Sequence, residues 1–295
     1  MDINFEYYKV FYYVAKYGNL TRAAAALGSN QPNVSRVMKL LEKQLNCRLF
    51  LREPRGVSLT EEGRKLYSHV EAACMHLLSA QEEIGRQDSG DTGAVEIGAT
   101  ESALHLYLLE KMHDFKIQKP GIRIKVHNHN TPEILKYLGS GRLDFAVITS
   151  PCNLPENARY EKLLSFREVL VGGRKYTHLG KKAVCLEELR EYPWIGLGSG
   201  TATYEFYRDF FVEHGTELEL DMEVATSDLL LPLIQNNLGI GFVPESLALA
   251  LLQEGKLVQI PLACELPDRS IQLVSEKGRA GSRAADSFYR YLKGR

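Results

Sequence analysis

The sequence predicts a chain of two parts with different fold classes. The first part is an all-α head with a small β-wing that leads into a long helix, and the second is a C-terminal α/β domain of two lobes. Two short helical patterns separated by a tight turn predict the head, and a heptad pattern over residues 61–86 predicts the long helix. From residue 94 onward, short apolar strand patterns alternate with helical ones, which is typical of an α/β sheet.

Composition sets the outer bounds. The chain has 295 residues, of which 44% are hydrophobic and 25% charged, so it can form two or three soluble domains. No apolar run approaches the roughly 18 residues of a transmembrane helix, and the N-terminus lacks the apolar core of a signal peptide, so we expect a cytoplasmic protein. The five cysteines are scattered without a C-x-x-C motif, so we expect neither a zinc site nor a disulfide framework.

The head begins with a helix over residues 4–17. Its apolar residues recur at helical spacing and should cover the back of the next two helices. These residues are Tyr7, Val10, Phe11 and Val14.

Two further helical patterns follow, over residues 21–27 and from residue 31 onward. The first is rich in alanine, which allows close helix packing, and Gly28 supplies the turn. Two helices joined by a short turn that contains glycine form the helix-turn-helix signature. In the second pattern, the apolar residues Val34, Val37, Met38 and Leu41 form one stripe.

The opposite face of the second helix is polar and basic. Asn30 is placed to cap the helix, and proline fits its first turn, where the missing N–H is not needed. A helix of this kind can enter a major groove with its N-terminal side chains against base edges. We expect Gln31, Pro32, Asn33, Ser35 and Arg36 near base edges, and Lys39, Arg52 and Arg55 against phosphates.

A short hairpin after this helix is predicted by β-like runs at 49–52 and 57–60 around a Pro-Arg-Gly turn. We interpret it as a wing that straddles the DNA backbone. Residues 1–55 carry nine basic and four acidic side chains, a net charge of +5, whereas residues 56–295 carry −6. This asymmetry favours nucleic acid as a partner of the head alone.

The run from residue 23 to residue 63 resembles the winged helix-turn-helix of LysR-type transcriptional regulators. The shared features are the alanine pairs, Gln31-Pro32, Ser35-Arg36, Leu41-Glu42, Leu49-Phe50 before the wing, and Leu59-Thr60-x-x-Gly63 after it. The length fits the family, and the rest of the chain resembles it more loosely. The resemblance implies a DNA-binding regulator with a dimerising linker helix, usually within a tetramer.

The long helix over residues 61–86 follows the cap candidate Thr60. Its apolar residues have the 4-3-4 spacing of a heptad seam, and at about 39 Å the helix is too long for a small head to bury. A second copy of the helix is the natural partner; the alternative is that the helix lies along its own C-terminal domain. The predicted dimerisation residues are Leu66, Val70, Ala73, Leu77 and Ile84.

The domain boundaries follow from these patterns. We expect the DNA-binding domain at 1–60, the linker helix at 61–88 and the effector-binding domain at 89–295. The alternating strands and helices predict parallel α/β halves: lobe I over about 94–166 and 269–295, and lobe II over about 167–268. This two-lobed form resembles periplasmic solute-binding proteins, with crossovers near 165–168 and 266–270.

Hydroxyl side chains gather where the predicted strands end. In open α/β sheets a ligand binds at the carboxyl ends of the strands, and hydroxyl and backbone N–H groups suit a small carboxylate or other oxyanion. Serine and threonine are also ordinary helix caps, so that alternative stays open. The candidate effector residues are Thr100, Ser102, Thr131, Thr149, Ser199, Thr201, Thr203 and Thr226.

The sequence provides no catalytic signature. His127 and His129 share a strand face without another ligand at metal spacing, so we expect no metal and no cofactor. No nucleophile is paired with a base, so the chain is not predicted to be an enzyme. Its expected partners are double-stranded DNA with an inverted-repeat operator, a small-molecule effector and itself, as a dimer or tetramer, with RNA polymerase as a further candidate.

The sequence leaves two alternative functions. A solute-binding module would explain the two lobes but not the basic head. A ligand-independent architectural DNA-binding protein would explain the head but would leave about 200 residues of α/β domain without a role.

Overall fold

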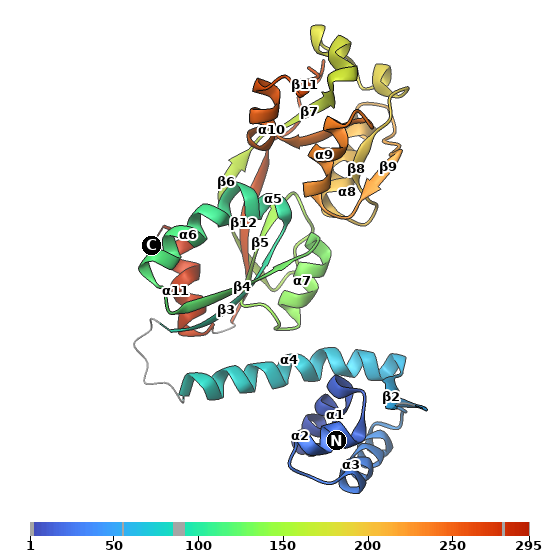
Figure 1. Cartoon of the computed structure of the whole chain (residues 1–295), viewed down its shortest axis with the longest axis vertical. Helices are drawn as coiled ribbons and strands as arrows, with labels where there is room; N and C mark the ends of the chain where they lie inside the picture. The colour runs from blue at the N-terminus through green and yellow to red at the C-terminus, as the bar shows by residue number, and fades with distance from the viewer. Residues whose placement is uncertain (1–2, 55, 85–91, 279–280, 295) are drawn as a thin grey trace. The chain divides into compact units, whose positions relative to one another are not determined.

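The computed structural model describes residues 3–54, 56–84, 92–278 and 281–294, with the backbone alone at 75, 76 and 78–84 (Figure 1). The chain divides into two compact units, residues 1–87 and, apart from the loop 140–142, residues 88–295. Each unit has its own apolar core.

The N-terminal unit is a three-helix head followed by a hairpin and a long helix. The three helices are α1 (Phe5–Tyr17), α2 (Leu20–Ala26) and α3 (Gln31–Leu45). Phe11, Val14 and Leu41 have no exposed surface. The whole predicted apolar stripe of α3 is buried, as predicted, because its residues recur once per turn on the face toward α1 and α2.

The hairpin consists of β1 (Phe50–Glu53) and β2 (Gly56–Leu59), each displaced by one residue from the predicted strands. The long helix is α4 (Glu61–Ile84), with Glu61 and Glu62 in its first turn, where negative charge suits the helix dipole.

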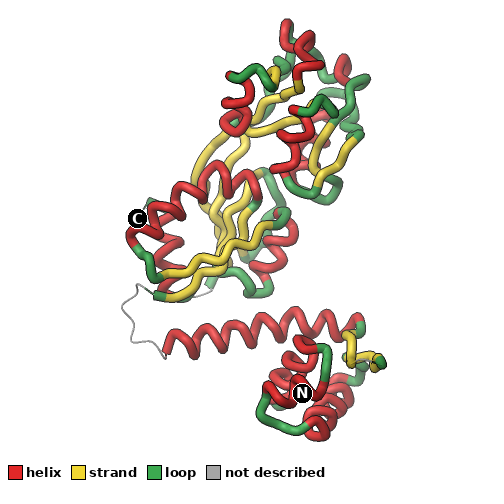
Figure 2. Tube along the Cα trace, in the orientation of Figure 1, coloured by secondary structure: helices red, strands yellow, loops and turns green. Residues whose placement is uncertain are grey.

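Lobe I of the C-terminal unit is built on a five-stranded sheet in the order β4-β3-β5-β12-β6 (Figure 2). Helices cover both of its faces: α6 and α11 contribute Phe115 and Phe288 to one core, and α7 contributes Ile134 and Leu138 to another. Its elements in chain order are β3 (Gly93–Ala99), α5 (Glu101–Ala103), a π-helical turn (Leu104–Leu108), α6 (Leu109–Gln118), β4 (Ile122–Asn128), α7 (Thr131–Gly139), β5 (Phe145–Ser150), β6 (Ala158–Phe166), β12 (Arg269–Glu276) and α11 (Arg283–Leu292).

Lobe II contains two smaller sheets, in the orders β10-β7-β11 and β8-β9. Trp194, Tyr207 and Phe242 lie in its main core. Its strands are β7 (Glu168–Gly173), β8 (Ile195–Leu197), β9 (Met222–Val224), β10 (Ile240–Pro244) and β11 (Leu257–Gln259). Its helices are α8 (Ala202–Glu213), α9 (Leu230–Gln235) and α10 (Glu245–Gln253), with 3-10 turns at Arg174–Lys181, Glu187–Leu189 and Ser227–Leu229.

The prediction of purely parallel sheets is wrong. Among the described strands, β4, β3 and β5 in lobe I and β8 with β9 in lobe II pair in parallel. β12 runs antiparallel to β5 and β6, and β7 runs antiparallel to β10 and β11. The chain leaves lobe I after β6 and returns with β12, so these strands are not joined by the helical crossovers that parallel neighbours need.

None of the helices in the described part of the chain is both long enough and apolar enough to cross a membrane.

Candidate functional site

The start of α3 is fixed by a side-chain cap, as predicted. Asn30 Oδ1 accepts a hydrogen bond of 2.9 Å from the backbone N–H of Asn33. The Asn33 side chain in turn donates to Ser29 Oγ at 3.1 Å and accepts from Arg36 Nη2 at 3.1 Å. These bonds hold the Asn33 amide and the Arg36 guanidinium together at the exposed N-terminal end of the helix.

The predicted DNA-contacting side chains share this exposed face. Gln31, Pro32, Asn33, Arg36 and Lys39 are exposed, and Ser35 is half-buried. Arg52 is exposed on β1 of the wing, whereas Arg55 lies outside the described residues.

Glu42 ties α3 to the wing, a role that the sequence does not predict. Its Oε1 atom accepts hydrogen bonds from the backbone N–H groups of Leu49, at 2.7 Å, and Phe50, at 3.2 Å. Both groups precede or begin β1, so the carboxylate sets where the wing starts relative to α3. The Leu41-Glu42 motif was the available signal, although its partners could not be predicted from the spacing alone.

The Leu59-Thr60-x-x-Gly63 motif joins the wing to α4. Thr60 Oγ1 accepts from the Gly63 backbone N–H at 2.9 Å, which caps α4 as predicted. A Cβ atom at Gly63 would lie 2.2 Å from the Leu49 carbonyl oxygen, so only glycine fits this close approach.

The predicted seam of α4 borders an apolar groove in the same unit. A cavity of about 520 Å³ is lined by Leu66, Val70, Ala73 and Leu77 together with residues of α1, including Phe5 and Tyr8. Val70 is buried against the head, while Leu77 is 60% exposed. The side chain of Ile84 lies outside the described residues.

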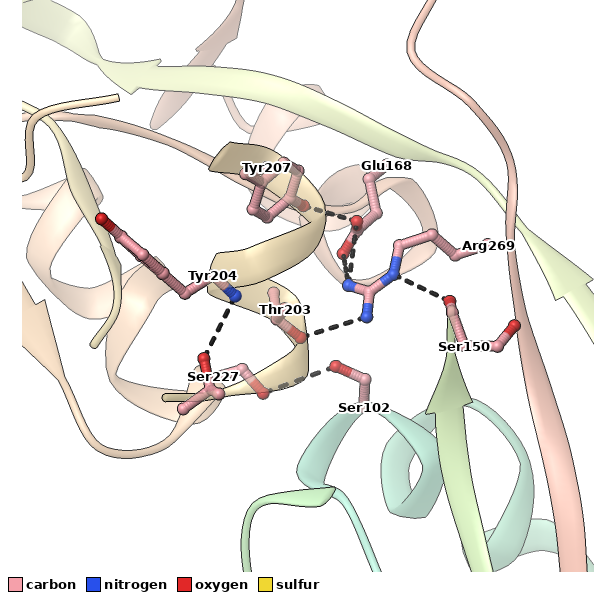
Figure 3. Close-up of polar contacts among 9 residues, drawn as sticks. Ser102, Ser150, Glu168, Thr203, Tyr204, Tyr207, Ser227 and Arg269 are labelled. Atoms are coloured by element: carbon pink, nitrogen blue, oxygen red, sulfur yellow. Dashed lines mark hydrogen bonds and ion pairs between the residues drawn. The ribbon is translucent and has the colours of Figure 1, made fainter. Parts of the chain in front are cut away.

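The two lobes of the C-terminal unit meet at the ends of their strands and helices. Ser102 of α5 and Ser227, at the turn before α9, approach each other with their hydroxyl oxygens 3.4 Å apart (Figure 3). A ligand between these two hydroxyls would replace a direct contact between the lobes.

A buried ion pair lies beside this contact (Figure 3). Arg269, the first residue of β12, donates from Nη1 to both carboxylate oxygens of Glu168, the first residue of β7, at 3.2 and 3.3 Å. Only 1% of the Arg269 side chain and 4% of the Glu168 side chain are exposed. The same guanidinium donates to the Ser150 carbonyl and to Thr203 Oγ1, each at 3.1 Å.

Tyr207 completes the ion-pair network by donating its hydroxyl to Glu168 Oε2. Burial, and then the adjacent Glu168 charge, raise the pKa of Tyr207 well above its ordinary value, so the phenol keeps its proton. Burial opposes the charge on Arg269, but the adjacent Glu168 and Tyr207 outweigh it and raise the pKa of Arg269, so the guanidinium stays charged.

The remaining predicted effector residues lie at the expected strand and helix ends. Thr100 is buried at the end of β3, and its Oγ1 atom has no hydrogen-bond partner among the described residues. Thr201 caps α8 by accepting from the Tyr204 N–H at 3.1 Å and also donates to the Gly198 carbonyl at 3.0 Å. Thr131 and Thr149 are buried, Thr203 and Thr226 are half-buried, and Ser199 is exposed.

The carboxylates and histidines of lobe I near these positions are paired. Glu101 accepts from Asn128 and lies 2.8 Å from His105 Nε2. His127 Nε2 lies 3.0 Å from Glu96 Oε2, and His129 Nδ1 lies 3.5 Å from Glu133 Oε2. The two histidines thus have carboxylate partners, and no cluster of three metal-ligating residues occurs in the described segments.

Comparison with known proteins identifies both units. Residues 5–64 match the family described as "Bacterial regulatory helix-turn-helix protein, lysR family", and residues 88–295 match the "LysR substrate binding domain". The chain belongs to the LysR family. It is therefore a DNA-binding transcriptional regulator with an effector-binding domain, as the resemblance in the head predicted, and membership of this family of regulators agrees with the prediction that it is not an enzyme.

Similar LysR proteins cover almost the whole chain. The activator CmpR of Synechocystis is 27% identical, with 97% of this chain and 93% of CmpR covered. The RuBisCO operon transcriptional regulator of Allochromatium vinosum is 24% identical, with 99% and 96% covered. The uncharacterized regulator YeiE of Escherichia coli is 26% identical, with 99% and 97% covered.

Solved LysR structures have the same fold. The crystal structure of CbnR, a LysR family transcriptional regulator, gives a TM-score of 0.68 at 19% identity, with 99% of both chains covered. The structure of full-length CbnR complexed with its target DNA gives a TM-score of 0.54, also at 19% identity and with 99% of both chains covered. The predicted two-part fold class is confirmed by these matches.

Proposed function

We propose that this LysR regulator binds an inverted-repeat operator as a dimer and responds to a small carboxylate or other oxyanion held at the lobe junction. In this proposal Gln31, Pro32, Asn33, Ser35 and Arg36 read base edges, and Lys39, Arg52 and Arg55 contact phosphates. The exposed, capped end of α3 supports this assignment.

An oxyanion effector is supported above all by the buried Thr100 hydroxyl, which has no hydrogen-bond partner in the described part of the chain. Buried hydroxyl groups are normally hydrogen-bonded, so an unpartnered one marks a place where a ligand or water completes the bonding. Ser102, Thr203 and Ser227 add further hydroxyls at the same junction. Glu101 and Glu168 are already paired, which limits their repulsion of an anion.

The other predicted effector residues differ in how free they are to contact a ligand. Both hydrogen-bonding roles of the Thr201 hydroxyl are used within α8 and its cap, which favours the structural role. Thr131, Thr149, Ser199 and Thr226 stay predicted contacts.

A second copy of the chain is the proposed occupant of the α1–α4 groove. The seam on α4 continues beyond the part that the head covers, and Leu77 is 60% exposed there. Burying such a stripe against the same stripe of a partner would give a two-fold dimer. Half-sites about 34 Å apart, or a multiple of that spacing, would follow.

Regulation requires the effector to bind one geometry of the protein better than another. We propose that the favoured lobe or dimer geometry changes half-site spacing and DNA bending, with RNA polymerase as a candidate partner and with assembly to a tetramer in line with the family. A location in the cytoplasm stays a prediction.

Titration calorimetry on the full-length protein tests the effector class. The panel contains sulfate, phosphate, bicarbonate and mono- and dicarboxylates from acetate to succinate. We expect one class of oxyanion to bind and Thr100→Val to weaken that binding about tenfold, as the loss of one hydrogen bond to a charged ligand predicts. An unchanged affinity in Thr100→Val would remove Thr100 from the site, and no binding by any member would contradict the oxyanion assignment.

A further inference from the structure

Arg269 is placed at the lobe junction but is closed off from any ligand. Its side chain is 1% exposed, and its three nitrogens donate to the Ser150 carbonyl, the Glu168 carboxylate and the Thr203 hydroxyl. The residues it joins belong to both lobes: Ser150 ends β5 of lobe I, while Glu168 and Thr203 belong to lobe II. Arg269 can therefore influence a ligand only through the groups that it holds.

The bond to Thr203 has a fixed direction. A guanidinium is a donor without acceptor capacity, so the Thr203 oxygen must accept the 3.1 Å bond from Nη2. A threonine hydroxyl has one proton to donate, and no residue in the described part of the chain accepts a hydrogen bond from Thr203. Thr201, two residues earlier, both accepts and donates within the chain, so its proton is already used.

The Thr203 hydroxyl lies at the lobe junction, where the effector is proposed to bind. Thr203 is in the first turn of α8, a helix of 12 residues, whose N-terminal end carries partial positive charge. Figure 3 shows Thr203 between Arg269 and the contact of Ser102 with Ser227. Its remaining lone pair is beside a guanidinium, which disfavours a cationic donor at this position.

We propose that Arg269 is a positioning residue that makes the Thr203 hydroxyl a hydrogen-bond donor to the effector and so selects an acceptor, such as an oxyanion oxygen. This inference rests on the proposed function and deepens it. Arg269 itself does not touch the effector. A purely structural Arg269 would hold the lobes together without any specific effect on what Thr203 contributes to binding.

Four proteins separate these two roles: the wild type, Thr203→Val, the pair Glu168→Gln with Arg269→Met, and all three changes together. The pair removes both buried charges at once, so neither is left unpartnered. The probe is the panel oxyanion that the wild type binds most tightly, and the readout is its dissociation constant by calorimetry. We expect Thr203→Val to raise the dissociation constant about tenfold in the wild type and less than about threefold in the paired variant.

Two further variants sharpen the result. Arg269→Lys keeps a cation and a hydrogen-bond donor. In this protein Thr203→Val should therefore weaken binding more than in the paired variant and less than in the wild type. Arg167→Gln is the matched control, because Arg167 lies next to the network with a side chain that is 74% exposed and pairs with Asp268 at 3.8 Å. Arg167→Gln should leave the cost of Thr203→Val unchanged.

Equal costs of Thr203→Val in both backgrounds, or no cost in the wild type, would overturn the inference while leaving the oxyanion effector in place. A wild type that binds no panel member would instead refute the proposed effector class, and the inference with it. If the paired variant does not fold, the test uses the dissociation constants of Thr203→Ser and Thr203→Val. Each change is made in the wild type and in Arg269→Lys. Thr203→Ser must keep the oxyanion affinity that Thr203→Val loses. The loss of affinity caused by Thr203→Val must also be smaller in Arg269→Lys than in the wild type.

Discussion

Glu42 illustrates, at the scale of single residues, how one carboxylate can organise the DNA-binding head. Its two hydrogen bonds to the backbone at the start of the wing are made by a half-buried group. We expect Glu42→Ala to destabilise the head by about 1–2 kcal/mol, the range of a hydrogen bond to a charged group that is partly solvated. Hydrogen exchange of the head amides measures this change. Gln44→Ala, an exposed position on the same helix, is the control; equal effects would contradict the anchoring role.

Variants of Arg36 and Lys39 test the proposed division between base contacts and phosphate contacts. Arg36→Ala should abolish the operator footprint while the fold stays intact, because a base-reading side chain carries discrimination of about 1–3 kcal/mol. Lys39→Ala should weaken binding to all sequences alike and lower the slope of log K against log salt by about one unit. Binding curves on operator and non-operator DNA at several salt concentrations distinguish the two. An operator footprint that survives in Arg36→Ala would refute the assignment.

The residues that sequence reasoning found are those whose role is local. The Asn30 cap and the Thr60 cap act within three residues along the chain, so their spacing was enough to predict them. Glu168 and Arg269 are 101 positions apart, and each looks like an ordinary surface charge in the sequence. Their burial depends on both lobe crossovers meeting at one point, which no local pattern encodes.

At the scale of elements, α4 tests the dimer proposal. Leu77→Lys places a charge on the exposed part of the seam and should convert the dimer to a monomer without unfolding the head, because Leu77 is 60% exposed in the single chain. Sedimentation velocity measures the change. Ser68→Lys, on the opposite side of the helix, should leave the dimer intact. Identical sedimentation of Leu77→Lys and the wild type would refute the seam.

Glu96 of β3 contacts Lys125 and His127 of β4, and these contacts predict how the stability of the C-terminal unit depends on pH. Burial opposes ionisation of Glu96, but hydrogen bonds from Lys125 and His127 outweigh it and lower the pKa of Glu96 below its ordinary 4.5. A lowered pKa contributes stability that is complete above about pH 4.5 and is lost as pH falls through the lowered value. Urea unfolding followed by the fluorescence of Trp194, the single tryptophan, should therefore show a loss of stability on acidification that Glu96→Gln reduces. A pH dependence unchanged in Glu96→Gln would contradict this role.

The elements that the sequence missed have weak patterns of their own. β6 is an edge strand with many exposed positions, so its apolar residues do not alternate cleanly. By contrast, α3 has clear helical periodicity, and it begins at the predicted residue 31.

At the scale of the whole molecule, charge is divided between the two functions. Residues 1–55 have a net positive charge, which attracts the DNA backbone. The rest of the chain has a net negative charge, which the DNA phosphates repel. Binding to the operator should therefore weaken steeply with salt, while binding of a small effector at the lobe junction should depend on salt much less.

In the proposed function, one chain couples operator binding to a small oxyanion. A footprint on the DNA flanking the protein's own coding region, with and without each panel compound, tests it most directly. We expect a protected inverted repeat whose pattern changes with one class of oxyanion. Protection of the repeat that no panel compound alters would contradict effector control by this class and favour a ligand-independent DNA-binding protein.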